Sequence, residues 1–554
     1  MPTSNLTDPD DGDSRRDAQQ TSRDGLVSGF RIVSLCTLLS RILGLARDMS
    51  LAAVFGAGPI LDAFTLAFRL PNLSRQLFGE GALTAAFLPI FVRELQSGER
   101  RTAQQLSSAM FWGLGGVLAG IVLVIEAGVI SVLVFTDVSG NSRLLLVLVA
   151  IQTPYLLCIC LAAQLSAVLH SLRQFVWPAL LPVCLNVVWL SGIAVAAAVF
   201  SAPESRIQAV AVAVVAGGAC QLAIALWAAA RRGFPVRRDF GNAWTRVREV
   251  AAAMLPIVIG FTVSQTNVFV DSFVAWAAAN TKFGELLPVP IDPGTASALF
   301  FGQRMYQFPL GIFGVALGTV LFPVLASHAQ AGDQLGLRRE LAHGLRLTIA
   351  IGVPASAGLV VLATPITNLL FRRGAFDAAD AQLTSTMIAV YGAAVWAYVG
   401  VLIAYRGFYA IGDRITPVRI SVGIVACNLT LNVVLVCTIG GVGLAIGGAL
   451  SAAVQAIAAS LLLQSRVGRL AWNEISATAA KTLLATAVMA VVCFTVARSL
   501  PPAVSLSARL TAVLLPVSLG VGVFLLLARL LRLSEPWELL GLVAARPRKS
   551  PPKT

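Results

Sequence analysis

The stretch SRILGLARDMSLAAVFGAGPILDAFTLAFRLPNLSRQLFGEGALTAAFLPIF, residues 40–91, is apolar enough to lie in a membrane, yet it contains several charged residues. Its charged residues are Arg41, Arg47, Asp48, Asp62, Arg69, Arg75 and Glu80. A charge at the centre of a bilayer costs roughly 2.5–3.5 kcal/mol on insertion scales, so such residues normally face a wet cavity or a partner. The stretch therefore predicts a charged, water-filled chamber inside a membrane protein.

The rest of the chain has the composition of a membrane protein. Of its 554 residues, 57% are hydrophobic and only 12% are charged, whereas soluble domains carry about 25% charged residues. Apolar runs long enough to cross a bilayer recur from end to end, and in hydrocarbon such runs must be helical to satisfy their backbone groups. We therefore expect an all-α polytopic membrane protein of about 14 transmembrane helices. The apolar segments run over 26–54, 60–92, 105–135, 143–169, 174–200, 206–230, 249–279, 295–327, 341–371, 384–410, 416–438, 441–464, 478–498 and 508–531.

The basic residues indicate how these segments are oriented. The net charge is +14, and the arginines and lysines lie mostly in alternate connections, on the side of the N-terminus. Basic loops mark the cytoplasmic side of a membrane, so both termini are predicted to be cytoplasmic. This distribution explains the positive charge without a nucleic-acid partner.

An internal repeat suggests two lobes. The second segment ends in GEGALTAAFLPIF and the eighth contains FGVALGTVLFPVL, and an offset of 234 residues pairs Ala82 with Ala316 and Pro89 with Pro323. A displacement of six spans preserves direction, so the halves would be parallel repeats with a substrate site between them. The predicted parts are a disordered cytoplasmic tail (1–24), an N-lobe (25–232), a C-lobe (233–470), two extra helices (471–533) and a basic cytoplasmic tail (534–554).

Five deep arginines are the candidate substrate-binding residues: Arg41, Arg47, Arg69, Arg75 and Arg304. A guanidinium group offers a planar fork of donors that suits a phosphate, so these side chains predict an anionic substrate. The alternative is internal salt bridging that only joins helices, with Asp48, Asp62 and Glu80 as the partners. We expect these three acids to orient the arginines or to latch a gate.

A second polar group combines Asp271 with Asn428 and Asn432, which lie four residues apart and so share a helix face. A carboxylate with amide oxygens suits a small hard cation such as sodium, which makes these residues a candidate metal site. The alternative is polar contact between membrane helices. No other cofactor is expected, and the sequence has no GxxxxGK[ST] phosphate-binding loop. The pattern therefore indicates a transporter and not an enzyme.

The sequence resembles a known family at several long motifs. SRILGLARD, FGAGPILDAF, RLPNLSRQLFGEGALTAAFLPIF and GQRMYQFPLGIFGVALGTVLFP are similar to those of the MurJ (MviN) lipid II flippases, members of the multidrug/oligosaccharidyl-lipid/polysaccharide exporter superfamily. The resemblance implies that lipid II, the undecaprenyl-diphosphate-linked peptidoglycan precursor, is moved from the inner to the outer leaflet of the bacterial cytoplasmic membrane. It implies alternating access of two lobes, with a groove for the lipid tail in the last two helices.

The resemblance also implies roles for single residues. Its essential arginines correspond to Arg41, Arg47, Arg75 and Arg304, and its essential aspartate to Asp62. A basic residue is usual where Arg69 stands, and Asp271 and Asn428 match a sodium site described in the family. That site has an acid where this chain has Asn432, and Leu444 and Gly448 supply no side-chain oxygen where a threonine would help. Membrane potential acting on the cationic chamber is an alternative driving force.

Three alternatives stay open at this stage. A flippase for another polyprenyl-linked glycan would need the same diphosphate chemistry. A drug or cation antiporter of the superfamily would need an acidic, aromatic cavity, and a membrane scaffold would need no deep charge. The expected partners are lipid II, membrane lipids and proteins of peptidoglycan synthesis, with the chain acting as a monomer.

Overall fold

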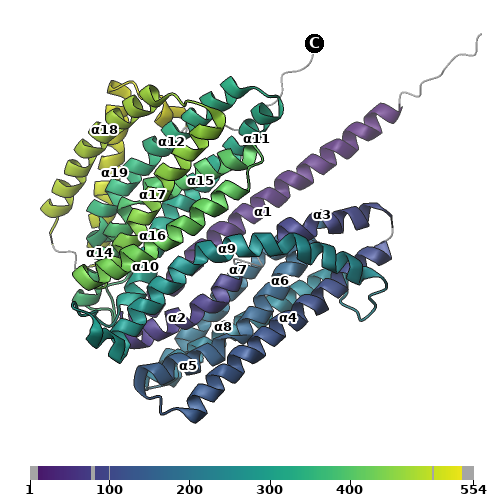
Figure 1. Cartoon of the computed structure of the whole chain (residues 1–554), viewed down its shortest axis with the longest axis horizontal. Coiled ribbons are helices and arrows are strands. Elements are labelled where there is room, and N and C mark those ends of the chain that lie inside the picture. Colours follow the sequence, from purple (N-terminus) through teal and green to yellow (C-terminus); the bar gives the residue numbers. More distant parts are fainter. Residues whose placement is uncertain (1–9, 76–81, 99, 502–504, 539–554) are drawn as a thin grey trace, which may run out of the picture. The chain divides into compact units, whose positions relative to one another are not determined.

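A computed structural model describes residues 10–75, 82–98, 100–501 and 505–538, and throughout these ranges every regular element is helical. The chain divides into two compact units (Figure 1). Unit 1 comprises Met1–Ser50 and Ala67–Ile259, and unit 2 comprises Leu51–Leu66 and Gly260–Thr554. The chain thus passes into unit 2 for a short stretch before it returns to complete unit 1.

Unit 1 is a bundle of long helices. Its helices α7 and α8 run side by side (Figure 1) because small residues let their backbones approach closely. A Cβ atom at Gly192 would lie 2.2 Å from the Cβ of Ala213, and one at Gly217 would lie 2.8 Å from Leu185. The elements are α1 (Asp10–Phe55), α2 (Pro59–Ser74), α3 (Ala82–Gln96), α4 (Arg100–Phe135), α5 (Gly140–Gln152), α6 (Pro154–Ser171), α7 (Val176–Val199), α8 (Pro203–Arg231) and α9 (Ala243–Asn280), of which α1, α2 and α9 continue into unit 2.

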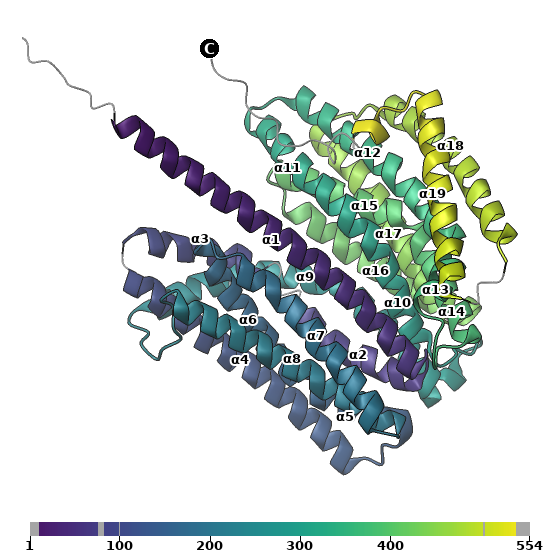
Figure 2. The same ribbon diagram turned by 180° about the vertical axis from the view of Figure 1, so that it is seen from behind.

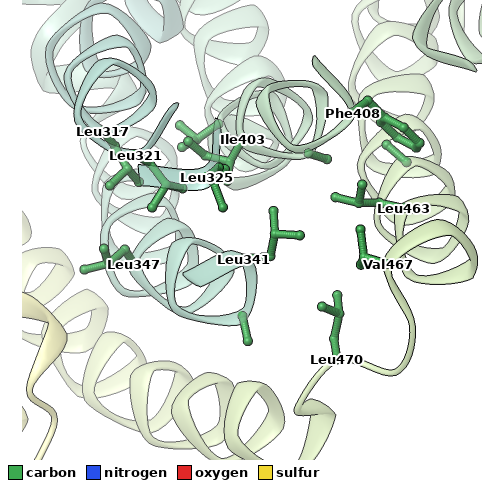
Figure 3. Packing of buried hydrophobic residues seen from close by; sticks show 14 of the residues in the cluster. Leu317, Leu321, Leu325, Leu341, Leu347, Ile403, Phe408, Leu463, Val467 and Leu470 are labelled. Atoms are coloured by element: carbon green, nitrogen blue, oxygen red, sulfur yellow. The ribbon is translucent and has the colours of Figure 1, made fainter. Parts of the chain in front are cut away.

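Unit 2 is built around a leucine-rich core that Figure 3 shows from close by. Leu325, Ile403 and Phe408 are fully buried there. Its elements are η2 (Lys282–Leu286), α10 (Thr295–Pro309), η3 (Leu310–Gly314), α11 (Val315–Gln330), α12 (Gln334–Val361), α13 (Ala363–Leu370), α14 (Ala378–Ala393), α15 (Val395–Ala410), α16 (Ile415–Ile439), α17 (Val442–Val467), α18 (Trp472–Ser499) and α19 (Leu506–Leu530).

The last two helices pack together along one side of unit 2 (Figure 2). Met489 and Cys493 of α18 and Phe524 of α19 form a buried apolar cluster with Leu362. At one end, Arg509 donates a hydrogen bond of 2.6 Å to the carbonyl of Arg372. The pair is therefore fastened to unit 2 by apolar and polar contacts.

Each predicted apolar segment coincides with one helix or with a broken helix. The fourth segment breaks at Thr153–Pro154, where proline lacks the N–H that would continue the helix of α5 and instead starts α6. The eighth is interrupted by the wide turn η3, and Gly440, with φ of 75°, separates α16 from α17. These breaks change the helix ends locally and leave the positions of the segments as hydropathy predicted them.

One expectation is not settled by the structure, and another differs from it. In the part of the chain that is described, ten helices are long and apolar enough to cross a membrane, or eleven when the bent pair α14–α15 is counted as one span. Fourteen spans therefore remain a prediction, partly because the second segment includes residues 76–81, which are not described, and its described helices α2 and α3 have 16 and 15 residues. Residues 10–24, expected to be disordered, continue α1, since extending a formed helix adds one hydrogen bond per residue.

The predicted lobe boundary at residues 232–233 lies in the connection between α8 and α9. The chain instead passes from unit 1 to unit 2 at Ile259–Gly260, inside α9. One continuous helix can belong to two compact units, one half to each, so the boundary between units does not have to lie in a loop. The lobes 25–232 and 233–470, which were inferred from the internal repeat, remain a prediction.

Candidate substrate-binding site

Arg47 is the most thoroughly buried of the predicted binding arginines, with 5% of its surface exposed. Its Nε and Nη2 atoms donate to Asp48 Oδ1 at 3.0 and 2.7 Å, and Nη1 donates to Asn186 Oδ1 at 3.1 Å. The guanidinium lies 4.2 Å from the ring centroid of Trp189. Since burial makes an unpaired charge very costly, these contacts explain how α1 carries this charge deep in unit 1.

Asn186 extends this network between α1 and α7. Its Nδ2 atom donates to the backbone oxygen of Ser40 at 3.0 Å, while its Oδ1 accepts from Arg47. One asparagine therefore meets a guanidinium and a helix carbonyl simultaneously, as its paired donor and acceptor allow. Asp48, predicted as a charge partner, is paired with its sequence neighbour Arg47 in this arrangement.

Aromatic side chains lie next to the Arg47 cluster, which consists of Arg47, Asp48, Asn186 and Trp189. Phe68 of α2 contacts Trp189 edge-on at 4.9 Å between centroids and stacks on Tyr155 at 6.0 Å. Tyr155 is fully buried, and Arg47 and Arg75 both lie within electrostatic range of its phenol. The hydroxyl of Tyr155 finds no hydrogen-bond partner among the described residues. Arg47 is the predicted binding arginine that contacts this aromatic cluster directly, through Trp189.

The other predicted residues of unit 1 are more accessible. Arg41 is exposed, and Arg69 and Arg75 are half-buried. Arg75 Nε donates to Asn72 Oδ1 at 3.2 Å, one turn earlier on α2. Glu80 lies outside the described residues, so its predicted pairing stays a prediction.

Asp62 is fully buried in the short part of α2 that belongs to unit 2. Its Oδ2 accepts from the backbone N–H of Gly294 at 2.7 Å, and its Oδ1 accepts from the backbone N–H and the hydroxyl of Ser297, each at 2.7 Å. Gly294 and Ser297 form the N-terminal end of α10, where unpaired N–H groups and the helix dipole favour a carboxylate. Asp62 therefore caps a helix that begins more than two hundred residues later.

Further contacts attach residues 51–66 to unit 2. The backbone N–H of Ala57 donates to Asp380 Oδ2 at 2.9 Å, and that of Ala375 donates to the carbonyl of Ala53 at 2.8 Å. Gly294 has φ of +94°, and a Cβ there would lie 2.2 Å from the carbonyl oxygen of Ala57. Only glycine suits both the conformation and this close approach.

Arg304 lies on α10, the helix that Asp62 caps. It is half-buried, and its guanidinium lies 5.3 Å from the ring centroid of Phe300, one turn earlier. Asp62, on α2, is hydrogen-bonded to the N-terminal end of the helix that carries Arg304, and both residues belong to unit 2. Arg41, Arg47, Arg69 and Arg75 belong to unit 1.

The structure brings the three predicted cation ligands together inside unit 2. Asn432 Nδ2 donates to Asp271 Oδ1 at 2.5 Å and to Asn428 Oδ1 at 3.1 Å. All three are buried, with 4%, 1% and 4% exposed for Asp271, Asn428 and Asn432. A nitrogen donor stands where both oxygens converge, so the cluster as arranged does not fit a cation. Among the described residues, no three His, Cys, Asp or Glu side chains form a metal-binding group.

Sequence reasoning missed Asn186, Trp189, Tyr155, Ser297 and Asp380. Asn186 and Trp189 have a sequence signal, because they lie three residues apart in an apolar segment and so face the same side of a helix. Asp380 belongs to a capping box at the start of α14. The residues that these side chains contact in the site, Arg47 for Asn186 and Ala57 for Asp380, are more than a hundred residues away in the sequence.

Comparison with known proteins gives consistent results. Residues 51–513 match the family model described as lipid II flippase MurJ. The chain is 31% identical over 472 residues to a probable lipid II flippase MurJ of Rhizobium tropici, covering 84% of this chain and 86% of that one. It is 33% identical over 457 residues to the lipid II flippase MurJ of Burkholderia cenocepacia, covering 79% and 83%.

Solved structures show the same fold. A lipid II flippase MurJ in an inward closed conformation matches with a TM-score of 0.72 and 22% identity, covering 92% of this chain and 99% of that one. An inward-facing multidrug resistance transporter of the MATE family matches with a TM-score of 0.61 and 13% identity, covering 79% and 97%.

Proposed function

The chain belongs to the lipid II flippase MurJ family, and from that premise we propose that it moves lipid II from the inner to the outer leaflet of the bacterial cytoplasmic membrane. The observation that carries the proposal is the family match over residues 51–513. A transporter of this kind needs a site for a diphosphate headgroup and no catalytic centre. The product of the transport serves cell-wall synthesis.

The arginines supply chemistry that suits this substrate. Arg41 of unit 1 is exposed, and Arg75 of unit 1 and Arg304 of unit 2 are half-buried. Guanidinium groups form charge-assisted hydrogen bonds to phosphate oxygens. Arg69 is placed similarly. Arg47 is engaged with Asp48 and Asn186, so binding through it would require an exchange of partners. We assign it to organising the site in the described state.

Alternating access has a physical basis in the path of the chain. Residues 51–66 are joined to unit 2 through Asp62 and Asp380, while the residues before and after them belong to unit 1. The chain passes between the units near Ser50–Leu51, Leu66–Ala67 and Ile259–Gly260, so backbone bonds at these three places would absorb a rotation of one unit against the other. In this proposal the hydrogen bonds of Asp62 hold residues 51–66 on unit 2 throughout the transport cycle.

The paired helices α18 and α19 are the proposed groove for the polyprenyl tail. Leu484 and Val491 of α18 and Leu514 and Val521 of α19 are exposed apolar side chains, suited to contact with hydrocarbon. Because the tail can stay in lipid, only the polar headgroup needs the charged site. The distribution of basic residues supports a cytoplasmic position for both termini.

One rival is a drug or cation antiporter, since the fold is shared with a MATE transporter. Such a protein must attract cations, whereas the deep arginines of this chain repel them. A flippase for a different polyprenyl-linked glycan would bind the same diphosphate. It is separated from the proposal only by testing substrates.

The test is lipid II translocation in proteoliposomes, together with rescue of a bacterial strain depleted of its own lipid II flippase. We expect rescue and lipid II translocation by the wild-type chain, with little activity toward another polyprenyl-diphosphate glycan. Transport of the second glycan alone would establish the rival flippase. Native mass spectrometry with co-purified lipid would report substrate and oligomeric state, for which we propose a monomer. Co-purification would test for partners in peptidoglycan synthesis.

A further inference from the structure

In the cluster of Asp271, Asn428 and Asn432, an amide nitrogen donates to one oxygen of a buried carboxylate. A cation binds where several oxygen atoms point at one place. Here the oxygens of Asp271 and Asn428 both accept hydrogen bonds from the amide nitrogen of Asn432. That nitrogen has two N–H donors and no acceptor capacity, so it takes the place of a cation and would repel one.

The orientation of the Asn432 amide is fixed by its neighbours. Turning it over would place Oδ1 against the carboxylate of Asp271, acceptor facing acceptor. In the observed orientation Oδ1 lies beside Gly447 of α17, where a Cβ would come within 2.2 Å of it. Oδ1 is buried and has no hydrogen-bond partner among the residues described, so the amide is held by its nitrogen and by the space that this glycine leaves.

Two positions of α17 offer no side-chain oxygen. On α17, Leu444 is fully buried and apolar, and Gly448 has no side chain. The phenol of Tyr398 lies within electrostatic range of Asp271 but is stacked on Tyr306, with ring centroids 4.2 Å apart. One phenol would not complete the coordination shell of a hard cation.

We propose that Asn432 is an internal substitute for a cation, so that unit 2 joins α9 to α16 without sodium. Replacing its nitrogen by oxygen would create a sodium site in the same place. The inference does not rest on the proposed function, because it concerns ion binding by the folded chain.

The experiment compares thermal unfolding of the purified full-length protein in sodium chloride and in choline chloride at equal concentration. For the wild type we expect the same Tm in both salts. For Asn432→Asp, which places two carboxylates together, we expect a Tm below that of the wild type in choline chloride and a saturable rise on titration with sodium. Asn473→Asp, at an exposed position of α18, is the control for added charge and should show no sodium-specific rise.

Two results would overturn the inference. One is a saturable, sodium-specific rise of the wild-type Tm. In that case the Oδ1 atom of Asn267, which is buried and has no hydrogen-bond partner among the described residues, would be the first further ligand to test. The other is indifference of Asn432→Asp to sodium. Should that variant fail to fold, Asn432→Ser supplies a neutral hydroxyl oxygen at the same place, and a smaller sodium-specific rise is expected. Its absence would count equally against the inference.

Discussion

Asp62 and Ser297, 235 residues apart, are joined by two hydrogen bonds of 2.7 Å, one from the backbone N–H of Ser297 and one from its hydroxyl. The same carboxylate accepts from Gly294, so it replaces the local side-chain cap that α10 lacks. The helix that carries Arg304 is thereby positioned by a residue from the N-terminal part of the sequence.

Replacing Asp62 by alanine should be strongly destabilising, because the buried backbone N–H groups of Gly294 and Ser297 would lose their acceptor, although the Ser297 hydroxyl could still donate to the carbonyl of Gly294. An unsatisfied buried group costs about 1–3 kcal/mol, whereas Ser297→Ala removes only one of the bonds and should cost about 1 kcal/mol. We therefore expect a much larger drop in Tm and in depletion rescue for Asp62→Ala than for Ser297→Ala. Equal Tm values for Asp62→Ala and the wild type would contradict the capping role.

Gly294 and Gly58 give a matched pair of glycine substitutions in the same region. Gly294→Ala combines a positive φ with a Cβ 2.2 Å from the carbonyl of Ala57, whereas a Cβ at Gly58 meets nothing within 4 Å. We expect Gly294→Ala to lower Tm and rescue activity, and Gly58→Ala to leave Tm almost unchanged. The measurement is fluorescence-monitored unfolding of both purified variants. Similar losses in both would show that the close contact does not control stability.

Much of the fold could be predicted from the sequence, because hydropathy depends on local composition. The predicted segments coincide with helices, and the four-residue spacing of Asn428 and Asn432 placed them on one face, as observed. Breaks such as Thr153–Pro154 were less visible, since a proline can either kink a helix or start one. The path of residues 51–66 into unit 2 depends on contacts with distant residues that no local pattern encodes.

For the candidate site too, the sequence did not reveal contacts between distant residues. Charge in an apolar stretch identified Arg47, Asp48 and Asp62 as unusual, but not their partners. Asp62 was expected to pair with an arginine or latch a gate, and its contacts instead are backbone N–H groups and Ser297. A carboxylate can be satisfied by a helix end as well as by a cation, and sequence alone does not separate the two.

Tyr155→Phe tests the buried phenol beside the Arg47 cluster. The substitution keeps the stacking on Phe68 and deletes a hydroxyl that has no partner within the described ranges. Because an unsatisfied buried hydroxyl is unfavourable, Tm should stay equal or rise. Gly218→Ala is the contrasting variant, since a Cβ there would lie 2.4 Å from the Tyr155 ring, and it should lower Tm. A marked loss of stability in Tyr155→Phe would reveal a partner for the hydroxyl.

Arg47 and Arg41 lie on the same helix but should respond differently to truncation. Arg47→Ala would leave Asp48 buried without its guanidinium partner, and breaking a buried pair in this way typically costs about 3–5 kcal/mol. We expect a large fall in Tm, and Arg47→Lys should recover only part of it because an ammonium lacks the planar fork.

Arg41 is exposed, so Arg41→Ala should leave Tm close to that of the wild type. If this guanidinium binds the diphosphate, lipid II translocation should nevertheless fall, because a charge-assisted contact of about 1.5–3 kcal/mol corresponds to a tenfold or greater loss of affinity. Arg339→Ala, at an exposed position of α12, controls for the loss of one positive charge. Stability and transport measured on the same preparations separate the two roles. Full transport by Arg41→Ala would remove that residue from the binding site, and an unchanged Tm for Arg47→Ala would remove Arg47 from the set that organises it.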